Sequence, residues 1–551
     1  MIPMQDGIQL ATDLYFPSEA DNSYPAILIR TPYNKNFLEE YGIYYSMRGY
    51  VVAIQDVRGR FSSEGDWVPF LNEGQDGYDS VEWLAAQGWC TGKIGMLGGS
   101  YSGSVQFLTA IKRPPHLSTI IPNIAPAMPF ENLPYDGGVL LLGWGIRWVD
   151  LVENARTGLE LQQKLMASIR NDWFTPLLDL PVIDLDRKIV GKEIAYWRDW
   201  IQHNTHDSYW EPLNYLEELA SLDLPVFLQS GWFDNGNRGT KLAYAQLKKG
   251  GNPNVRMIIG PWSHSDRGGR YLEGQDMGPE ADINMFDLYR NWFDFWLKNA
   301  DNKIMDEPPV QCYLMRSNYW LRGNKYPLTN TSLRNYYLDS ESNTAGQVTK
   351  GILRPALPDD SNSYDSFSYN PASPTPSVYA YLKRNQLEQY QHQIASRNDV
   401  LIYETPVLKK ALAIAGPISL VLYASSSAKD TDWSATLYGL NEMNEPYPLG
   451  MTFGMVRARF RSSRSVPVLL EPGQIYEYII DLSHTAVTMP VGHRLRLEIA
   501  SASFPEYSRN LNTGGHNEMD STYVVADQKI YHSRQFPSHL VLPVINPDDF
   551  K

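Results

Sequence analysis

The chain has 551 residues, a length at which we expect two or three domains rather than a single core. Its hydrophobic content of 43% and aromatic content of 12% are typical of globular proteins. The formal net charge is −14 and no strongly basic run offsets it. We therefore predict no nucleic-acid partner, because binding to a phosphate backbone needs clustered Lys and Arg.

Signals for a metal, a cofactor or a membrane are absent from the sequence. Cys90 and Cys312 are the only cysteines, and the chain contains neither a C-x-x-C nor an H-E-x-x-H motif, so we predict no metal and no cofactor. Apolar runs such as GGVLLLGWGI end after about ten residues, short of the ~20 that span a bilayer, so we predict no membrane partner. The first residues contain no signal segment; we expect a cytoplasmic protein, with secretion left open if the N-terminus has been trimmed.

The first third of the chain alternates short apolar runs with helical stretches. We predict strands over 24–30, 50–57, 93–99 and 117–126, and a helix within 73–89. Buried strands that alternate with helices indicate a parallel sheet covered on both faces. We therefore assign residues 1–126 to the first part of an α/β domain.

The pattern changes near residue 127. Residues 127–221 are helical in character and rich in Trp, Tyr and Leu, with Leu140, Trp144, Trp148 and Leu151 spaced along one face of a helix. Strand-like runs then return at 224–230 and 255–262, separated by a helical stretch. We interpret 127–221 as a helical cap inserted into the α/β domain, whose second part is 222–304.

Helices largely vanish after residue 305. Short alternating runs at 310–317, 418–425, 475–483 and 493–501 are punctuated by Pro, Asn, Asp and Gly. This pattern predicts an antiparallel β-sandwich over 305–551, and a jelly roll is one topology it allows. Within it, the segment DTDW at 430–433 is interpreted as a solvated turn.

The segment IGMLGGSYSG, residues 94–103, places one hydroxyl among small residues directly after a predicted strand. A nucleophile elbow needs such small residues, because the serine lies on a strained turn between strand and helix. The strict G-x-S-x-G motif fails, since Ser102 occupies the second glycine position and Gly103 follows it. The segment alone fits an elbow at Ser100 and an ordinary glycine-rich turn equally well.

Two further residues favour the elbow. Asp234 follows the predicted strand at 224–230, and His264 follows the next one, at 255–262. Hydrolases of this kind carry the chain order Ser, acid, His, with the three groups at the carboxyl ends of parallel strands. Of the ten histidines only His264 meets both requirements, although a loop cap at Asp234 and a core histidine are the alternatives.

An acyl-transfer serine also needs donors for the oxyanion. The N–H of Tyr101, directly after the serine, is one candidate. The loop where lipases carry H-G-G-G reads TPYNK here, and Pro32 has no N–H to donate. The hydroxyl of Tyr33 is a candidate replacement, with simple packing of that ring as the alternative.

These motifs resemble a known family. TPYNK, DVRGRFSSEG, GGSYSG, GWFD, GPWSHS and GHRLRLEIASASFPEYSRNLNTG are similar to the cocaine-esterase-like hydrolases, whose relatives include α-amino-acid ester hydrolases, glutaryl acylases and X-prolyl dipeptidyl peptidases. The family motif G-x-S-Y-x-G accounts for the displaced glycine. The resemblance implies an α/β-hydrolase domain with an inserted cap and a jelly-roll-like domain. It also implies a nucleophile Ser100, a base His264, an orienting Asp234, and an oxyanion hole of the Tyr33 hydroxyl and the Tyr101 N–H.

The substrate is less closely defined. Amino-ester hydrolases of the family hold the substrate ammonium with carboxylates, one directly after the triad aspartate, where this chain has Asn235, Gly236 and Asn237. We therefore disfavour α-amino esters. Aromatic residues near the site are candidate substrate contacts, with helix core as the alternative: Tyr135, Trp144, Trp148, Trp232 and Phe233.

We predict a metal-free serine hydrolase that cleaves carboxylic esters of small molecules through an acyl-enzyme. An amide-cleaving acylase or X-Pro dipeptidyl peptidase is the alternative, and a non-catalytic binding protein is a further one. Asp56, Arg58 and Arg60 are interpreted as residues that hold a loop beneath the elbow by ion pairs and glycine turns, with contact to the substrate as the alternative. The oligomeric state stays open.

Overall fold

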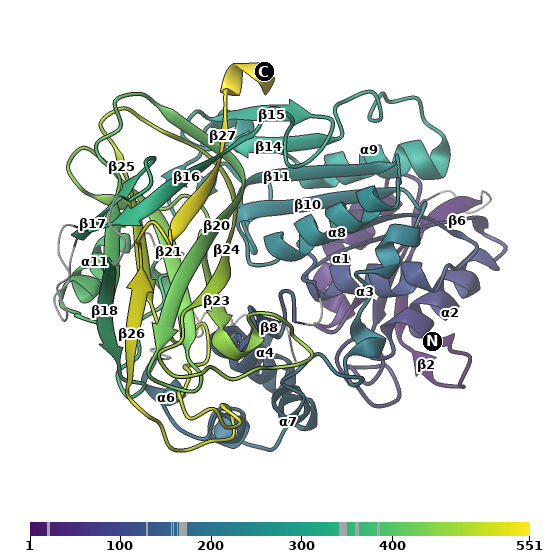
Figure 1. The fold of residues 1–551 in the computed structure, drawn as a ribbon. Helices are drawn as coiled ribbons and strands as arrows, with labels where there is room; N and C mark the ends of the chain where they lie inside the picture. The colour runs from purple at the N-terminus through teal and green to yellow at the C-terminus, as the bar shows by residue number, and fades with distance from the viewer. Residues whose placement is uncertain are drawn as a thin grey trace.

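The computed structural model describes residues 1–18, 23–127, 130–155, 157, 159–161, 163–164, 174–340, 350–358, 363–382 and 386–550. An α/β body and an all-β body lie side by side, and the helical insertion lies against both of them (Figure 1). Most of the buried apolar side chains form one continuous cluster that runs through all three, and Ile2, Met4 and Leu10 form a small second cluster.

A nine-stranded sheet forms the centre of the α/β body. Its strand order is β15-β14-β11-β10-β7-β6-β4-β5-β3. All neighbouring pairs from β5 to β14 are parallel, and the edge strands β3 and β15 are antiparallel to their neighbours. The strands are β3 (Thr12–Tyr15), β4 (Tyr24–Thr31), β5 (Val51–Asp56), β6 (Cys90–Gly99), β7 (Leu117–Asn123), β10 (Val226–Phe233), β11 (Val255–Ser263), β14 (Val310–Leu314) and β15 (Tyr319–Gly323).

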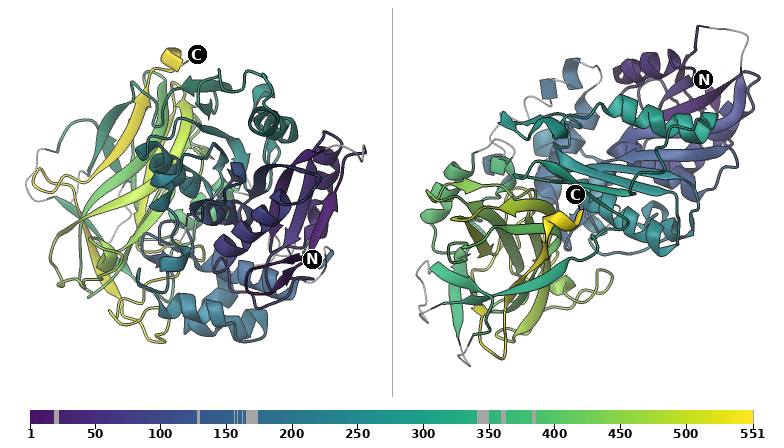
Figure 2. Two further views of the ribbon diagram at one scale, coloured as in Figure 1. Left: turned by 90° about the vertical axis from the view of Figure 1, so that its right-hand side faces the viewer. Right: turned by 90° about the horizontal axis from the view of Figure 1, so that it is seen from above.

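Helices cover both faces of this sheet, which explains why its inner strands are continuous apolar runs (Figures 1 and 2). On one face α9 packs against β6, where Gly95 leaves room for the ring of Phe293. On the other face α2 packs on α3, and both contact β6. The helices are α1 (Glu39–Ser46), α2 (Glu73–Ala85), α3 (Tyr101–Ile111), α8 (Asn237–Lys249) and α9 (Met285–Lys298).

The helical insertion lies between β7 and β10. Its main helix, α4 (Leu142–Asn154), carries Trp144 and Trp148, as the periodicity predicts. Leu140 belongs instead to a short strand before the helix begins, so the predicted helical face is wrong at its first position. The other described elements are β8 (Tyr135–Asp136), β9 (Val139–Leu140), α6 (Phe174–Leu177), η2 (Val182–Asp184), η3 (Asp186–Val190), α7 (Ala195–Gln202), η4 (Glu211–Leu213) and η5 (Glu218–Ser221).

The C-terminal body is built almost entirely of antiparallel strands, and this agrees with the predicted all-β fold class. The long strands β20 and β24 pair along most of their length and form its centre. The described strands are β16 (Ser332–Asp339), β17 (Lys350–Arg354), β18 (Tyr364–Tyr369), β19 (Leu401–Glu404), β20 (Leu412–Ser426), β21 (Asp432–Leu440), β22 (Pro446–Tyr447), β23 (Phe453–Arg457), β24 (Tyr476–Met489), β25 (Arg494–Ala500), β26 (Ala526–Tyr531) and β27 (His539–Ile545), and the described α-helices are α10 (Tyr379–Leu382) and α11 (Leu387–Ala395).

The strands β14 and β15, within residues 310–323, join the nine-stranded sheet and not the sheet of the all-β body. The expectation of a sandwich strand at 310–317 is wrong, because β14 pairs in parallel with β11 and β15 pairs with β14, so the nine-stranded sheet continues past residue 304. A short alternating run looks the same in the sequence whichever sheet it joins. The division at 126, 221 and 304 was a prediction, and we now propose that the α/β domain extends to residue 323.

The segment 430–433 is buried rather than solvated. Asp430, Asp432 and Trp433 have no exposed surface. The two carboxylates pair with buried arginines, Asp432 with Arg457 at 3.0 Å and Asp430 with Arg459 at 2.8 Å. The expected solvated turn is therefore wrong: ion pairs to distant arginines allow these acids to lie in the core.

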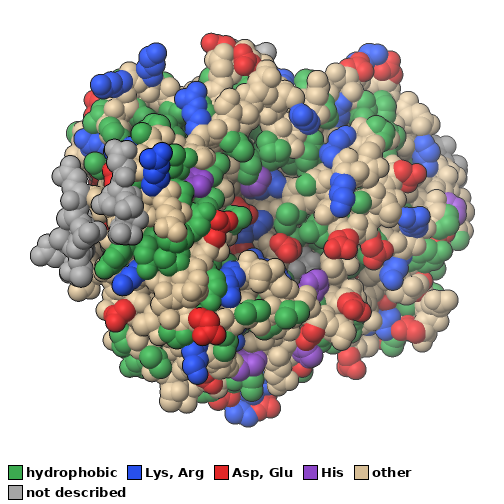
Figure 3. All heavy atoms as spheres, in the orientation of Figure 1, with side chains coloured by type: hydrophobic (Ala, Val, Ile, Leu, Met, Phe, Trp, Pro, Cys, Tyr) green, Lys and Arg blue, Asp and Glu red, His purple; other side chains and the backbone are tan. Residues whose placement is uncertain are grey.

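Two observations concern the surface and the helices. Figure 3 shows one face of the molecule, on which acidic and basic side chains are interspersed and neither kind gathers into one large patch. Among the described residues, no helix is long and apolar enough to cross a membrane.

Candidate active site

Ser100 lies on a sharp turn between β6 and α3. Its backbone has φ 61° and ψ −123°, in a region that residues with a side chain rarely adopt. The turn is held by the Ser100 N–H, which donates to the Asn123 carbonyl of β7 at 3.0 Å. The serine is thus presented at the carboxyl edge of the sheet on a strained strand-to-helix turn, the geometry of a nucleophile elbow.

The glycines around Ser100 are required by close contacts. A Cβ on Gly98 would lie 2.6 Å from the Cβ of Ser102, and a Cβ on Gly103 would lie 2.8 Å from the Asn123 carbonyl oxygen. Gly103 is therefore the residue of α3 that approaches the neighbouring strand. This contact explains why the glycine stands three residues after Ser100 rather than two.

Asp234 and His264 meet at the same edge of the sheet. The strands before them, β10 and β11, are parallel neighbours in which Phe233 lies beside Ser263. The His264 Nδ1 and the Asp234 Oδ1 are 2.7 Å apart. The structure therefore joins the two residues that the strand-end argument selected.

The carboxylate of Asp234 is fully buried and fixed by donors. Its Oδ1 also accepts from the Gly236 N–H at 2.9 Å, and its Oδ2 accepts from the Ser230 hydroxyl at 3.3 Å. The His264 side chain, in contrast, is 41% exposed. Within the described residues its Nε2 forms no hydrogen bond with the Ser100 hydroxyl; in unliganded hydrolases such bonds are often loose and tighten when substrate binds.

Tyr33 lies on the loop after β4, with its hydroxyl close to Ser100. The phenol oxygen accepts a hydrogen bond from Trp148 Nε1 at 3.0 Å and interacts with the Ser100 side chain. The residue keeps some exposed surface, but its hydroxyl is surrounded by protein. This burial raises the pKa of Tyr33 in spite of the two hydrogen bonds and the nearby Arg60 charge. The phenol is therefore a neutral O–H donor.

Tyr101 offers its N–H to the site but not its side chain. It is the first residue of α3, so its N–H has no carbonyl partner within the helix. Its hydroxyl donates to Glu73 Oε1 at 2.8 Å and accepts from the Phe70 N–H at 2.9 Å and from Trp67 Nε1 at 3.2 Å. The side chain therefore anchors the start of the helix to α2 and the loop before it.

The segment DVRGRFSSEG supports this region by backbone hydrogen bonds at Asp56 and Arg60 and by ion pairs at Arg58, where the expected ion pairs are confirmed. The Asp56 carboxylate accepts from the Lys35 N–H at 2.7 Å. Arg60 Nε donates to the Pro32 carbonyl at 3.0 Å, directly before Tyr33. Arg58 bridges the carboxylates of Asp76 and Asp6. These contacts hold the loop that carries Tyr33.

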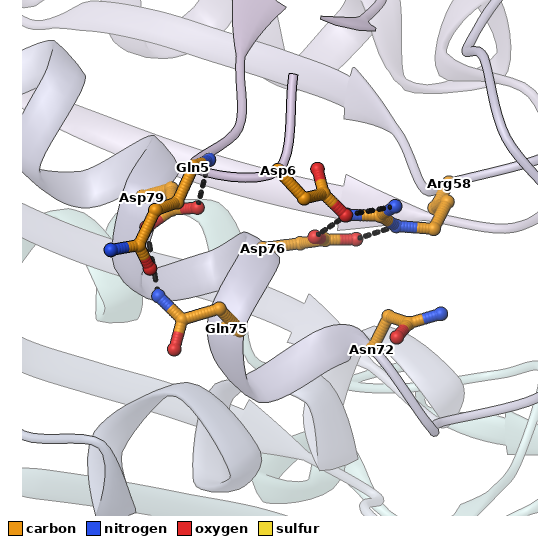
Figure 4. A pocket seen from close by; sticks show the side chains of 7 residues that line it. All are labelled: Gln5, Asp6, Arg58, Asn72, Gln75, Asp76 and Asp79. Carbon is orange, nitrogen blue, oxygen red and sulfur yellow. Dashed lines mark hydrogen bonds and ion pairs between the residues drawn. The ribbon is translucent and has the colours of Figure 1, made fainter. Parts of the chain in front are cut away.

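A separate hollow of about 350 Å³ lies at the outer end of this network (Figure 4). Figure 4 shows Arg58 between Asp6 and Asp76, while Gln5 and Gln75 contact Asp79. None of Ser100, Asp234 and His264 lines it. Its lining residues are Gln5, Asp6, Arg58, Asn72, Gln75, Asp76 and Asp79.

The five aromatic residues predicted as substrate contacts separate into two groups. Tyr135 and Trp232 are fully buried. The Tyr135 hydroxyl donates a hydrogen bond to the Trp200 carbonyl at 2.9 Å, and Trp232 Nε1 donates one to the Tyr313 carbonyl at 2.8 Å. These two side chains therefore pack in the core and present no surface to a ligand in this structure.

Trp144, Trp148 and Phe233 retain exposed surface. Trp144 is half-buried and stacks on Trp148, their ring centres 5.8 Å apart. Phe233, 5% exposed, lines a hollow of about 10 Å³ together with Ser263. Trp148 has a second contact that the sequence did not reveal, its hydrogen bond to Tyr33.

One carboxylate beside Asn235 escaped the sequence reasoning. Glu506, from the C-terminal body, is buried and accepts from Asn235 Nδ2 at 3.4 Å. Arg147 Nη2 lies 3.7 Å from Glu506 Oε2. The charge of this acid is therefore paired with a guanidinium. Nothing in the sequence near Asn235 signals it, because 271 residues separate the two.

Comparisons with known proteins match both halves of the chain. The sequence profile of the X-Pro dipeptidyl-peptidase (S15) family matches residues 6–266, and that of the X-Pro dipeptidyl-peptidase C-terminal non-catalytic domain matches residues 302–541. Cocaine esterase of Rhodococcus sp. (strain MB1 Bresler) is 32% identical over 99% of this chain and 98% of its own.

Solved structures give the same picture. An α-amino acid ester hydrolase superposes with a TM-score of 0.83 and 25% identity, over 99% of this chain and 95% of its own. An aminopeptidase from a marine sediment archaeon, Thaumarchaeota archaeon, superposes with a TM-score of 0.83 over 99% of this chain and 96% of its own; at 24% identity this likeness shows the fold.

Proposed function

Because the chain belongs to the serine hydrolase family that includes the S15 X-Pro dipeptidyl-peptidases and cocaine esterase, we propose that it cleaves carboxylic esters through an acyl-enzyme on Ser100. The observation that carries this proposal is the 2.7 Å bond between Asp234 and His264 at the sheet edge where Ser100 lies on its strained turn. A buried carboxylate that holds a half-exposed imidazole is the arrangement that a general base requires.

The reaction follows from these positions. Ser100 Oγ attacks the ester carbonyl while His264 Nε2 takes its proton, and the Asp234 carboxylate stabilises the imidazolium. The Tyr101 N–H and the Tyr33 O–H donate to the oxyanion of the tetrahedral intermediate. His264 then gives its proton to the departing alkoxide, which leaves as the alcohol. Water repeats the sequence on the acyl-enzyme and releases the acid.

A fluorophosphonate probe tests the nucleophile. Such probes phosphonylate only an activated serine, so we expect stoichiometric labelling of the native enzyme, lost in Ser100→Ala. Ser102→Ala is the matched control, because Ser102 is a buried serine two residues away. Labelling that survives Ser100→Ala, or its absence in the native protein, would contradict the proposal and favour a binding protein.

We propose that the acyl group is apolar or aromatic and carries no α-ammonium. Two observations support this: the ring of Trp148 contacts the hydroxyl of Tyr33, and the carboxylate next to Asn235 is paired with Arg147. A buried ammonium needs an acid that is not already neutralised.

Matched substrates test this choice of acyl group. Phenylacetate and phenylglycine esters of one alcohol differ only by the ammonium, and we expect kcat/KM to be higher for phenylacetate. An X-Pro anilide belongs in the same panel because the family profile carries that activity in its name. Faster turnover of the anilide, or of the phenylglycine ester, would overturn the substrate proposal while leaving the Ser100 chemistry intact.

The predicted cytoplasmic location stays a proposal that rests on the sequence. Fractionation of the producing cells, with antibody detection of the protein, tests it. Recovery in the medium would contradict it.

A further inference from the structure

The hydrogen bond between Trp148 and Tyr33 restricts where the Tyr33 proton can point. An indole N–H is a donor only, so in the 3.0 Å contact the tyrosine oxygen must be the acceptor. The O–H of Tyr33 therefore cannot point toward Trp148. It is left to point elsewhere around the oxygen, whose other hydrogen-bonding neighbour is the Ser100 side chain.

This restriction matters because Tyr33 is a side-chain donor. A backbone N–H in an oxyanion hole is aimed by the fold, whereas a phenol O–H rotates about its C–O bond. A donor stabilises developing charge best when it is oriented before the charge appears. A group that can only donate supplies that orientation when it binds the phenol oxygen, because the O–H must then point away from it.

Stacked rings hold Trp148 itself in place. It is 8% exposed, and its ring lies nearly parallel to those of Tyr101, Trp144 and Trp200, with centres 6.3, 5.8 and 6.0 Å away. Such stacking restricts the ring rotation that would withdraw the N–H from Tyr33. Trp148 also belongs to the inserted cap, while Tyr33 belongs to the α/β domain.

We propose that Trp148 is a positioning residue that orients the Tyr33 hydroxyl toward the oxyanion. The proposal rests on the function given above, in which Tyr33 is an oxyanion donor. In this proposal Trp148, a residue of the cap, affects the rate of the chemical step. This role is different from contact with the acyl group.

The test compares three variants with the native enzyme by steady-state kinetics on an aryl ester. Tyr33→Phe removes the donor, and we expect kcat to fall roughly 10²–10³-fold. Trp148→Phe removes only the orienting N–H, and we expect kcat to fall roughly tenfold with KM changed less than about twofold, since the ground-state carbonyl carries little charge. In the double variant, Trp148→Phe should add no further loss, because no hydroxyl is left to orient.

Trp67→Phe is the matched control. It removes a similar indole N–H bond, at 3.2 Å, to the hydroxyl of Tyr101, which donates its O–H to Glu73. We expect kcat to stay within about twofold of the native value. Replacement of Trp148 by 3-benzothienylalanine keeps the bicyclic shape without the N–H, and it should reproduce the Trp148→Phe kinetics even where the smaller ring impairs folding.

The outcomes separate the two proposals. A native kcat in Tyr33→Phe would overturn the role of Tyr33 and with it this inference. A low kcat in Tyr33→Phe with a native kcat in both Trp148 variants would overturn the inference alone. A loss that is multiplicative in the double variant, or that appears in KM rather than kcat, would show that Trp148 acts through packing or substrate contact.

Discussion

The two halves of the molecule bury charged side chains in different ways. In the all-β body, Arg457 lies between the carboxylates of Asp432 and Glu518, at 3.0 and 2.9 Å, and all three side chains are at most 2% exposed. In the α/β body, Asp234 is equally buried but its partner His264 is 41% exposed. The first cluster is closed on all sides, whereas the second has one open side.

This difference separates a structural role from a chemical one. A closed cluster has no face for a ligand, so its charges can act only on the fold, where a buried pair is costly to break. In an open pair, the buried acid fixes the orientation of an imidazole ring that can contact the substrate. The following changes break or sharpen this contrast, starting with the largest effect.

Asp234→Asn should disable the open pair without unfolding the protein. The amide presents N–H groups to His264 Nδ1 and favours the wrong tautomer, so we expect kcat to fall about 10⁴-fold, with the unfolding temperature nearly unchanged. Ser230→Ala, which removes the 3.3 Å bond to the other carboxylate oxygen, should cost less than about tenfold. A large drop in the unfolding temperature of Asp234→Asn would show that this pair is structural as well.

Arg457→Met should have the opposite effect: it should lower stability and leave activity unchanged. It leaves two buried acids without their cation, so we expect the free energy of unfolding to fall by about 3–5 kcal/mol, with native kcat for the protein that stays folded. Urea denaturation measures the free energy of unfolding, and kinetics at low temperature measure kcat. Arg270→Met, which breaks a pair with Asp276 in which both partners are exposed, should leave the urea midpoint unchanged.

Two glycines of the α/β body show a similar contrast between crowded and open surroundings. Gly103 faces the Asn123 carbonyl closely, so Gly103→Ala must displace α3, at a cost of about 1–3 kcal/mol in stability and with a lower kcat. Gly88→Ala is the control, because a Cβ there meets nothing within 4 Å; we expect a change within about 0.5 kcal/mol. Equal effects of the two substitutions would argue against a crowded elbow.

The smallest expected effect is a plateau of the rate at alkaline pH. Burial raises the pKa of Tyr33, so its phenol keeps its proton, and its ability to donate, where an ordinary tyrosine begins to ionise near pH 10. Between pH 8 and 10 we expect kcat to stay constant. A fall in this range that disappears in Tyr33→Phe would mean that the phenol titrates normally and is not enclosed as described.

Local patterns predicted much of this molecule. The parallel strands from β5 to β11 were recognisable because each is a continuous apolar run, and Asp234 and His264 were recognisable because each follows such a run. Contacts between distant segments had no local signal. Arg457 lies 25 residues from Asp432 and 61 from Glu518, and Trp148 lies 115 from Tyr33. Only folding brings these partners together, so the buried ion pairs and the hydrogen bond from Trp148 to Tyr33 were missed.

The path of β14 has a consequence for any attempt to divide the chain. Residues 310–314 add a strand to the open edge of β11, whose own residues are almost all buried. A protein truncated at residue 304 would leave the N–H and C=O groups of that apolar strand unpaired, which is a template for intermolecular strand addition. We therefore expect a fragment that ends at residue 304 to aggregate, whereas a fragment that includes β14 and β15 keeps the edge of β11 covered.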